Sequence, residues 1–339
     1  NAAEDGTIRF QPLTFTASQL KGNKSKTFTY TVREIRQSAG GVNYDSHMGM
    51  WQITVTDDLT GQLKAETRTN AAYPTTFTNT YQAKPVSVQF RAHKTLNDPD
   101  HTGIQLQAGQ YEFKCVEDKT GGQVGTVKTN DQQGNIRFDQ LSFPLVDTYV
   151  FTMTEQDTTI PGVTKDGTVA TITYVVKDVD HKGKLTVVSK TVTPTNGNSK
   201  NITFTNHYSP KNVGYSISGV KNIVNTDTAT SRVPQDGEFK FQLNAISARD
   251  ADGNTISVND MPMPAGSQDG TQTVSNKGSG FTFGQMVYTM PGAYTYHVKE
   301  LAGTDKTIGY STQEYDVTVT VTDQDGMLAA TADRQTNDI

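Results

Sequence analysis

A short stretch of alternating apolar and polar residues occurs twice in this chain and limits the folds open to it. Residues 75–81 and 202–208 share the pattern T-F-T-N-x-Y. Period-two alternation rich in Thr, Phe and Tyr predicts a β-strand at both places. On such a strand Phe204, Asn206 and Tyr208 point to one face. An unpaired amide in an apolar row is costly, so we expect Asn206 to have a partner inside the fold.

Short alternating segments of the same kind run through the rest of the chain. Examples are residues 28–32, 171–176 and 315–321, and Asp-Gly pairs mark turns between such segments. No long amphipathic helix pattern interrupts them. The sequence therefore predicts an all-β protein made of tandem immunoglobulin-like β-sandwich domains.

Further patterns recur along the chain at matching distances. G-x-I-R-F occurs twice, and a strand-like segment that ends in Glu occurs three times, at 28–34, 149–155 and 294–300. From Asn79 to Asn206 is a step of 127 residues, and from Lys94 to Lys221 is a step of 127 residues too. Two independent landmarks with one spacing indicate a tandem repeat.

The repeat divides the chain into three predicted units. Residues 84–208 form one complete unit. Residues 1–83 are predicted to be the C-terminal part of a preceding isopeptide-type sandwich, without its front strands. Residues 209–339 are predicted to be a third unit without its last strand, because the spacing puts its Asn a few residues past the end. Short proline-containing linkers join the units at 82–85 and 209–212.

Composition argues against several classes of function. The formal net charge is −5 without a basic patch, so no nucleic-acid partner is expected. No apolar run is long enough to cross a membrane, so no membrane partner is expected. Cys115 is the single cysteine, which rules out an intramolecular disulfide. Neither a signal peptide nor a cell-wall sorting signal is visible, which predicts a processed fragment or a cytosolic protein.

No metal and no other cofactor is expected. The histidines lack metal-ligand spacing, and residues 250–254 resemble the start of a calcium loop only in part. Met261 stands where such a loop has Glu, so a β-turn is predicted there. No nucleophile-elbow, P-loop or dinucleotide-binding pattern occurs.

A Lys on an early strand, a Glu on a later strand and an Asn on the last strand recur in one order. With the Y-T-x-x-x-E and T-F-T-N-x-Y motifs, this order resembles the isopeptide-linkage domains of Gram-positive pilins, the streptococcal major-pilin type, and more distantly the Cna-B domains of adhesins. The resemblance implies an amide bond between Lys94 and Asn206, promoted by Glu155. It also implies site residues in the other units, namely Lys221 and Glu300 in the third and Glu34 and Asn79 in the first.

The chemistry explains these residue types. A lysine nucleophile must be neutral, and burial favours the neutral amine. Burial also raises a carboxyl pKa, so a protonated Glu155 can donate to the Asn206 carbonyl and then relay the proton that lets ammonia leave. An ordinary buried Lys–Glu salt bridge is the alternative interpretation. The reaction runs once, so the chain is not expected to be an enzyme in the usual sense. The predicted pocket walls are Phe90, Phe151, Phe204 and Tyr208.

The resemblance implies a structural stalk or shaft segment of a cell-wall-attached surface protein or pilus, outside the cell. Its expected partners are neighbouring domains of the same fibre. One alternative is a ligand-binding adhesin module that recognises a host protein or glycan, for which the inserted segment around residues 261–266 is a candidate. Another is a pilin that a sortase polymerises through Lys211.

Overall fold

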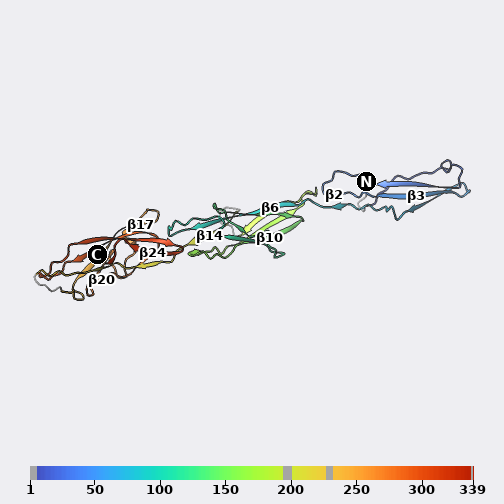
Figure 1. The fold of residues 1–339 in the computed structure, drawn as a ribbon. Helices are drawn as coiled ribbons and strands as arrows, with labels where there is room; N and C mark the ends of the chain where they lie inside the picture. The colour runs from blue at the N-terminus through green and yellow to red at the C-terminus, as the bar shows by residue number, and fades with distance from the viewer. Residues whose placement is uncertain (1–5, 194–200, 227–231, 337–338) are drawn as a thin grey trace. The chain divides into compact units, whose positions relative to one another are not determined.

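The computed structural model describes residues 6–193, 201–226, 232–336 and 339. Almost every regular element is a β-strand (Figure 1), which confirms the predicted all-β class. Within the described residues there are two short 3-10 helices, Ala17–Leu20 and Val258–Asp260. No helix in this part of the chain combines the length and apolar character needed to span a bilayer. The chain divides into two compact units, of which one contains residues up to 88 with 142–148 and 175–189.

The first repeat contains a three-stranded antiparallel sheet in the order β1-β3-β4, and a short pair, β2 with β5. Leu20 and Val55 are its buried hydrophobic residues among those described. The strands are β1 (Ser25–Arg33), β2 (Val42–Asn43), β3 (Met48–Asp57), β4 (Leu63–Thr69) and β5 (Thr80–Tyr81).

One strand predicted for the first repeat is shorter than expected. Residues 75–79 are not in a strand, and β5 covers only Thr80–Tyr81. The corresponding strand of the middle repeat pairs along its length with a parallel neighbour, whereas no described strand pairs with residues 75–79. Backbone groups without a ladder partner hydrogen-bond elsewhere, so alternation alone does not make a strand.

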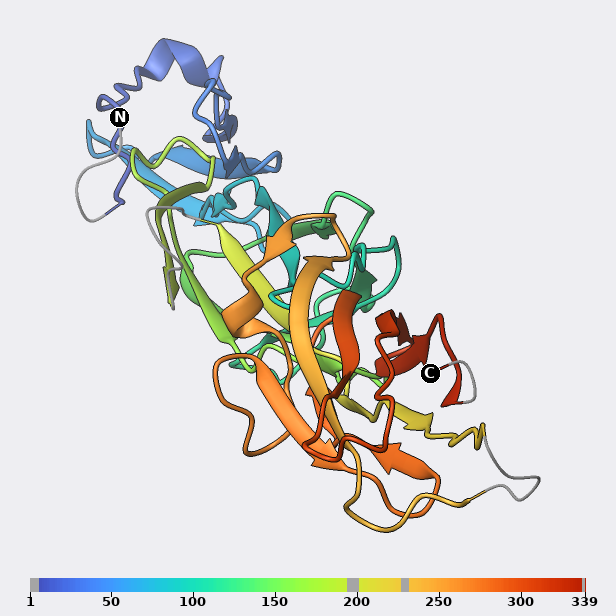
Figure 2. The same ribbon diagram turned by 90° about the vertical axis from the view of Figure 1, so that its left-hand side faces the viewer.

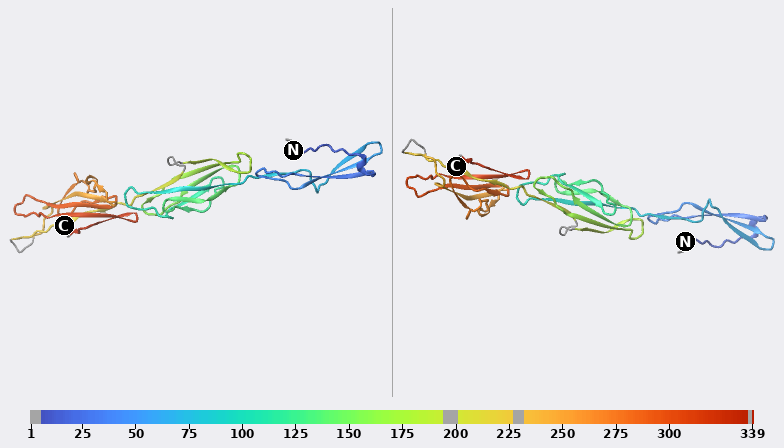
Figure 3. Two further views of the ribbon diagram at one scale, coloured as in Figure 1. Left: turned by 90° about the horizontal axis from the view of Figure 1, so that it is seen from above. Right: turned by 90° about the horizontal axis from the view of Figure 1, so that it is seen from below.

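The middle repeat forms two layers, drawn in cyan to yellow-green in Figure 3. One sheet has the order β13-β12-β10-β7-β8 and the other the order β11-β14-β6-β9. The strands are β6 (Val86–Asn97), β7 (Glu112–Glu117), β8 (Lys128–Thr129), β9 (Asn135–Phe143), β10 (Asp147–Glu155), β11 (Val163–Thr164), β12 (Val169–Lys177), β13 (Thr186–Thr193) and β14 (Ile202–Tyr208).

Strand β14 has the alternation that its sequence predicts. Its residues at even numbers, from Ile202 to Tyr208, are buried. β14 runs parallel to β6, with Phe204 opposite Lys94 and Asn206 opposite Leu96. Because paired residues of neighbouring strands share a face, Lys94 and Asn206 lie on the same inner face of the sheet.

The third repeat has its core between a large sheet and two small ones, drawn in yellow to red in Figure 2. The large sheet has the order β18-β17-β22-β23-β24, with β19 also paired to β17, and the small sheets are β15-β21 and β16-β20. The strands are β15 (Val213–Tyr215), β16 (Ser218–Val220), β17 (Lys240–Asp250), β18 (Thr255–Ile256), β19 (Thr271–Ser275), β20 (Gly280–Thr282), β21 (Met286–Tyr288), β22 (Gly292–Leu301), β23 (Glu314–Gln324) and β24 (Met327–Ala332).

Candidate functional site

Three polar side chains of the middle repeat meet in its core. Lys94 comes from β6 and Asn206 from β14 of one sheet, and Glu155 from β10 of the facing sheet. They are 1%, 0% and 4% exposed. Lys94 Nζ lies 2.7 Å from Glu155 Oε2, and Asn206 Nδ2 donates to Glu155 Oε1 at 2.7 Å. One carboxylate therefore binds both nitrogens that an amide-forming reaction exchanges.

The Asn206 carbonyl is held by a group that the sequence analysis missed. The backbone N–H of Asp166 donates to Asn206 Oδ1 at 2.7 Å. A backbone N–H can only donate, so the atom that faces it must be the carbonyl oxygen. The expectation that Glu155 donates to this carbonyl is therefore wrong for this arrangement, because Glu155 faces the amide nitrogen instead.

Burial sets the electrostatics of the lysine. Burial lowers the pKa of Lys94, and the hydrogen bond and charge of Glu155 oppose this shift. Lys94 Nζ also lies 4.6 Å from the ring centroid of Tyr111, which is 1% exposed. Tyr111 was not among the predicted pocket walls. It precedes β7 without a recognisable motif, so only its apolar character could have pointed to it.

The four predicted wall residues are all buried but differ in their contacts. The Phe90 and Phe151 rings pack edge-on against each other, with centroids 4.8 Å apart. The Phe204 ring packs against Phe113, with centroids 5.2 Å apart. The Tyr208 hydroxyl donates to Asp323, so this end of the side chain serves another contact.

Gly134 explains why the G-x-I-R-F pattern begins with glycine. Its φ is +83°, and a Cβ there would lie 2.1 Å from the carbonyl oxygen of Lys94. The Lys94 N–H donates to the Gly134 carbonyl at 2.7 Å. Any side chain at this position would push the lysine strand out of place. The equivalent Gly6 has no neighbour within 4 Å, because its repeat has no described lysine strand.

The first repeat holds part of the same constellation. Asn79 Nδ2 donates to Glu34 Oε1 at 2.7 Å, and the Asp45 N–H donates to Asn79 Oδ1 at 2.8 Å. Glu34 Oε2 is buried and has no hydrogen-bond partner. In the middle repeat the corresponding oxygen accepts from Lys94. Asn79 is exposed, unlike Asn206, so this site is open to water.

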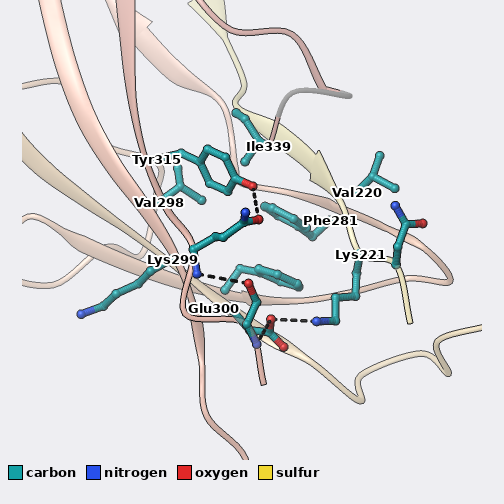
Figure 4. Close-up of a pocket in the computed structure, with 12 residues that line it drawn as sticks. Val220, Lys221, Phe281, Val298, Lys299, Glu300, Tyr315 and Ile339 are labelled. Carbon is teal, nitrogen blue, oxygen red and sulfur yellow. Dashed lines mark hydrogen bonds and ion pairs between the residues drawn. The ribbon is translucent and has the colours of Figure 1, made fainter. Parts of the chain in front are cut away.

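The third repeat holds the complementary part, shown in Figure 4. Lys221 Nζ lies 2.8 Å from Glu300 Oε2, and the two side chains are 11% and 3% exposed. The lysine nitrogen lies 4.6 Å from the Phe239 ring centroid, as Lys94 lies over Tyr111. Glu300 Oε1 is buried without a partner, and in the middle repeat the corresponding oxygen accepts from Asn206.

A groove of about 280 Å³ opens beside this lysine and glutamate. Phe281, Val298, Tyr315 and Ile339 are among the residues that line it (Figure 4). The Ile339 carbonyl accepts from the Val220 N–H at 2.9 Å, so Ile339 lies beside β16. Ile202 lies beside β6 in the same way, opposite Ala92.

One group of side chains in the described part of the chain has metal-ligating atoms close together. The ligand atoms of His101, Asp250 and Asp252 lie within 4.8 Å of one another. His101 and Asp252 are exposed, and Asp250 already accepts the Asn254 N–H at 2.8 Å. A Gly253 N–H to Asp250 carbonyl bond closes the predicted β-turn. These contacts account for the group as a turn with a surface ion pair.

The tyrosine of T-F-T-N-x-Y makes a contact that recurs. Tyr81 donates to Asp178, and Tyr208 donates to Asp323. Beside the second contact, the Lys211 N–H donates to Gly326 O at 2.9 Å. In both places the aspartate belongs to a hairpin region of the following repeat, β12–β13 or β23–β24. The linkers are therefore tied by hydrogen bonds as well as stiffened by proline.

Comparison with known proteins gives one family and several solved structures. The family described as the Spy0128-like isopeptide containing domain matches residues 1–82, 90–209 and 217–339. The major pilin of Streptococcus pyogenes is similar at 17% identity, over 74% of this chain and 93% of that one, with a TM-score of 0.27. The T-13 major pilin of the same species is 18% identical, over 76% and 95% of the chains, with a TM-score of 0.28.

A more distant similarity is to the Bacillus anthracis TIE protein. It is 9% identical over 83% of this chain and 41% of that one, with a TM-score of 0.24. No curated protein sequence matches. The family match alone extends over nearly the whole chain in three tandem segments. The chain belongs to the family of Spy0128-like isopeptide containing domains.

Proposed function

We propose that this chain is a structural stalk or shaft segment of a cell-wall-attached surface protein or pilus. Its middle repeat forms an amide bond between Lys94 and Asn206, with Glu155 as promoter. The observation that carries the proposal is the fully buried Glu155 carboxylate, which binds the lysine amine and the asparagine amide nitrogen at 2.7 Å each. An ordinary buried salt bridge accounts for the lysine contact but gives no reason for the amide.

The reaction follows from these contacts. Lys94 and Glu155 share one proton, and its transfer along their hydrogen bond leaves a neutral amine. The amine nitrogen bonds to Asn206 Cγ, and the bond from Cγ to Nδ2 breaks. Glu155 takes a proton from the attacking nitrogen and returns one to the leaving nitrogen, so one ammonia leaves. The carboxylate is regenerated, and the chain reacts once without turnover.

Mechanical protection is the benefit that we assign to the bond. It joins β6 and β14, the first and last strands of the middle repeat. On the chain-entropy model for disulfides, closing a loop of about 110 residues stabilises the fold by about 4–5 kcal/mol. A pulling force that enters at β6 leaves through β14, so the strands between them carry none of it.

The partners that fit this role are neighbouring domains of the same extracellular fibre. The recurring tyrosine contacts support this choice, since Tyr81 and Tyr208 each tie the end of one repeat to a hairpin region of the next. Buried hydrogen bonds at such places resist bending of the linkers.

Peptide mapping tests the bond directly. After protease digestion, we expect the peptides that contain Lys94 and Asn206 to be recovered as one branched species, lighter by one ammonia than their sum. An Asn135→Ala chain, altered at another asparagine of the same repeat, should give the same branched species, and an Asn206→Ala chain should not. Recovery of the two wild-type peptides only as separate species would contradict the proposal.

A further inference from the structure

A backbone N–H occupies one fixed place in two of the three sites. The Asp45 N–H donates to Asn79 Oδ1 at 2.8 Å, and the Asp166 N–H donates to Asn206 Oδ1 at 2.7 Å. Each of these aspartates lies 11 residues after the glutamate of its repeat, Glu34 or Glu155. No lysine or glutamate reaches this oxygen in the described contacts of either site.

Strand pairing holds this N–H in place. Val163–Thr164 pairs antiparallel with β14, and Val42–Asn43 pairs with β5 in the same way. Two residues further on, the Asp166 carboxylate accepts from the N–H groups of Thr205 and Thr168. The loop is therefore tied to the strand that holds Asn206 on both sides of the donor.

The first and third repeats support the same placement. The Asp45 carboxylate accepts from the Thr78 and His47 N–H groups, so the loop is tied in the same way. In the third repeat, Ser311 lies 11 residues after Glu300, and its N–H donates to Glu300 Oε2 at 3.1 Å. The N–H points into the site there even without an asparagine to receive it, and without an aspartate side chain.

We propose that the Asp166 N–H is the group that stabilises the negative charge on Asn206 Oδ1 during bond formation, and that the Asp166 carboxylate positions it. When the lysine nitrogen attacks Cγ, the electron pair of the C=O bond moves to Oδ1, and it returns when ammonia leaves. Glu155 faces the two nitrogens, so the oxygen needs a separate donor. A preorganised N–H aimed at such an oxygen is worth about 10²–10³ in rate.

The inference rests on the proposed bond, and the test separates the two. Cell-free synthesis can place the α-hydroxy analogue of aspartate at position 166, which replaces the N–H by an ester oxygen and keeps the carboxylate. Linkage is followed by intact mass at fixed times after synthesis. We expect the ester at 166 to slow linkage about 10²–10³-fold. The same replacement at Asp157, an exposed aspartate of the same repeat, should leave the rate unchanged.

Side-chain variants separate the donor from its support. Asp166→Asn keeps an oxygen for the Thr205 and Thr168 N–H groups and should link at close to the normal rate. Asp166→Ala keeps the N–H but frees the loop, and should link more slowly. A 166 ester that links as fast as the 157 ester overturns the inference, whereas a wild-type chain that never links overturns the proposed function instead.

A measurement on an intact backbone covers the case in which the ester variant fails to fold. In a Glu155→Ala chain, which keeps the Asn206 amide unlinked, the Asp166 amide proton should resonate downfield in NMR spectra. Adding Asn206→Ala should move this resonance upfield, because the acceptor is gone. An unchanged resonance would show that the N–H does not donate to Asn206 and would overturn the inference.

Discussion

At the scale of single residues, the middle site depends on how Glu155 divides its two oxygens. Oε2 faces the Lys94 amine and Oε1 faces the Asn206 amide nitrogen. The incomplete sites follow the same division, since the unpartnered oxygens of Glu34 and Glu300 are those that face no lysine and no asparagine, respectively. The carboxylate geometry is thus a property of each repeat and does not depend on the presence of both partners.

Glu155→Ala should leave the fold intact and stop linkage. The side chain is the contact that removes a proton from one nitrogen and supplies one to the other, and no described neighbour replaces it. Intact-mass measurement of the purified variant checks this, with Glu112→Ala, an exposed glutamate of the same repeat, as the control. If Glu155→Ala still loses ammonia, the role given to Glu155 is wrong.

Asp166 should make the stability of the middle repeat depend on pH. Burial raises the pKa of Asp166, but hydrogen bonds from Thr168 and Thr205 outweigh this and leave the pKa below its ordinary value. Its contribution is therefore present above about pH 3.9 and is lost as pH falls through the lowered pKa. The difference in free energy of unfolding between wild type and Asp166→Asn should be constant near neutral pH and shrink in acid. A difference that grows on acidification would contradict this sign.

The sequence indicates the side chains of the site better than its backbone. Lys94, Glu155 and Asn206 lie at recurring spacings on alternating segments, so the repeat pattern identifies them. The Asp166 N–H has no side-chain signature, and only the register of β11 against β14 places it at the amide. Tyr111 belongs to no recurring motif, because the third repeat uses Phe239 at the corresponding place.

At the scale of elements, T-F-T-N-x-Y forms a full strand only where a neighbour pairs with it. Strand β14 lies between β6 and β11, with alternate side chains buried. In the first repeat the same pattern gives only the two residues of β5, paired with β2. Periodicity predicts which face of a segment is apolar, whereas the extent of a strand depends on pairing that sequence alone does not reveal.

Tyr208→Phe should loosen the contact between the end of the middle repeat and the β23–β24 hairpin. It removes the hydroxyl that donates to Asp323 next to the Lys211 bridge, at a cost of about 1 kcal/mol. Hydrogen exchange at the Lys211 and Leu328 amides, which bond across this contact, should speed up about five-fold. Tyr30→Phe, in the first repeat, is the control. Unchanged exchange at both amides would remove the tyrosine from the joint.

At the scale of the whole molecule, the proposed bond should separate the middle repeat from the other two in stability. Asn206→Ala prevents linkage and should lower the free energy of unfolding of the middle repeat by about 4–5 kcal/mol. Thermal unfolding monitored with limited proteolysis checks this, and Glu155→Ala should shift the transition in the same direction. Equal melting temperatures for wild type and Asn206→Ala would contradict the mechanical account.

The three repeats differ in which partners their described residues provide, and this gives a count that can be measured. Only the middle repeat brings a lysine, a glutamate and an asparagine together within the 339 residues described in part above. The intact mass of the purified 339-residue chain tests the central claim most directly. The account predicts a monomer lighter than its sequence mass by one ammonia. A chain at its full sequence mass, or one that has lost two or three ammonia molecules, would contradict it.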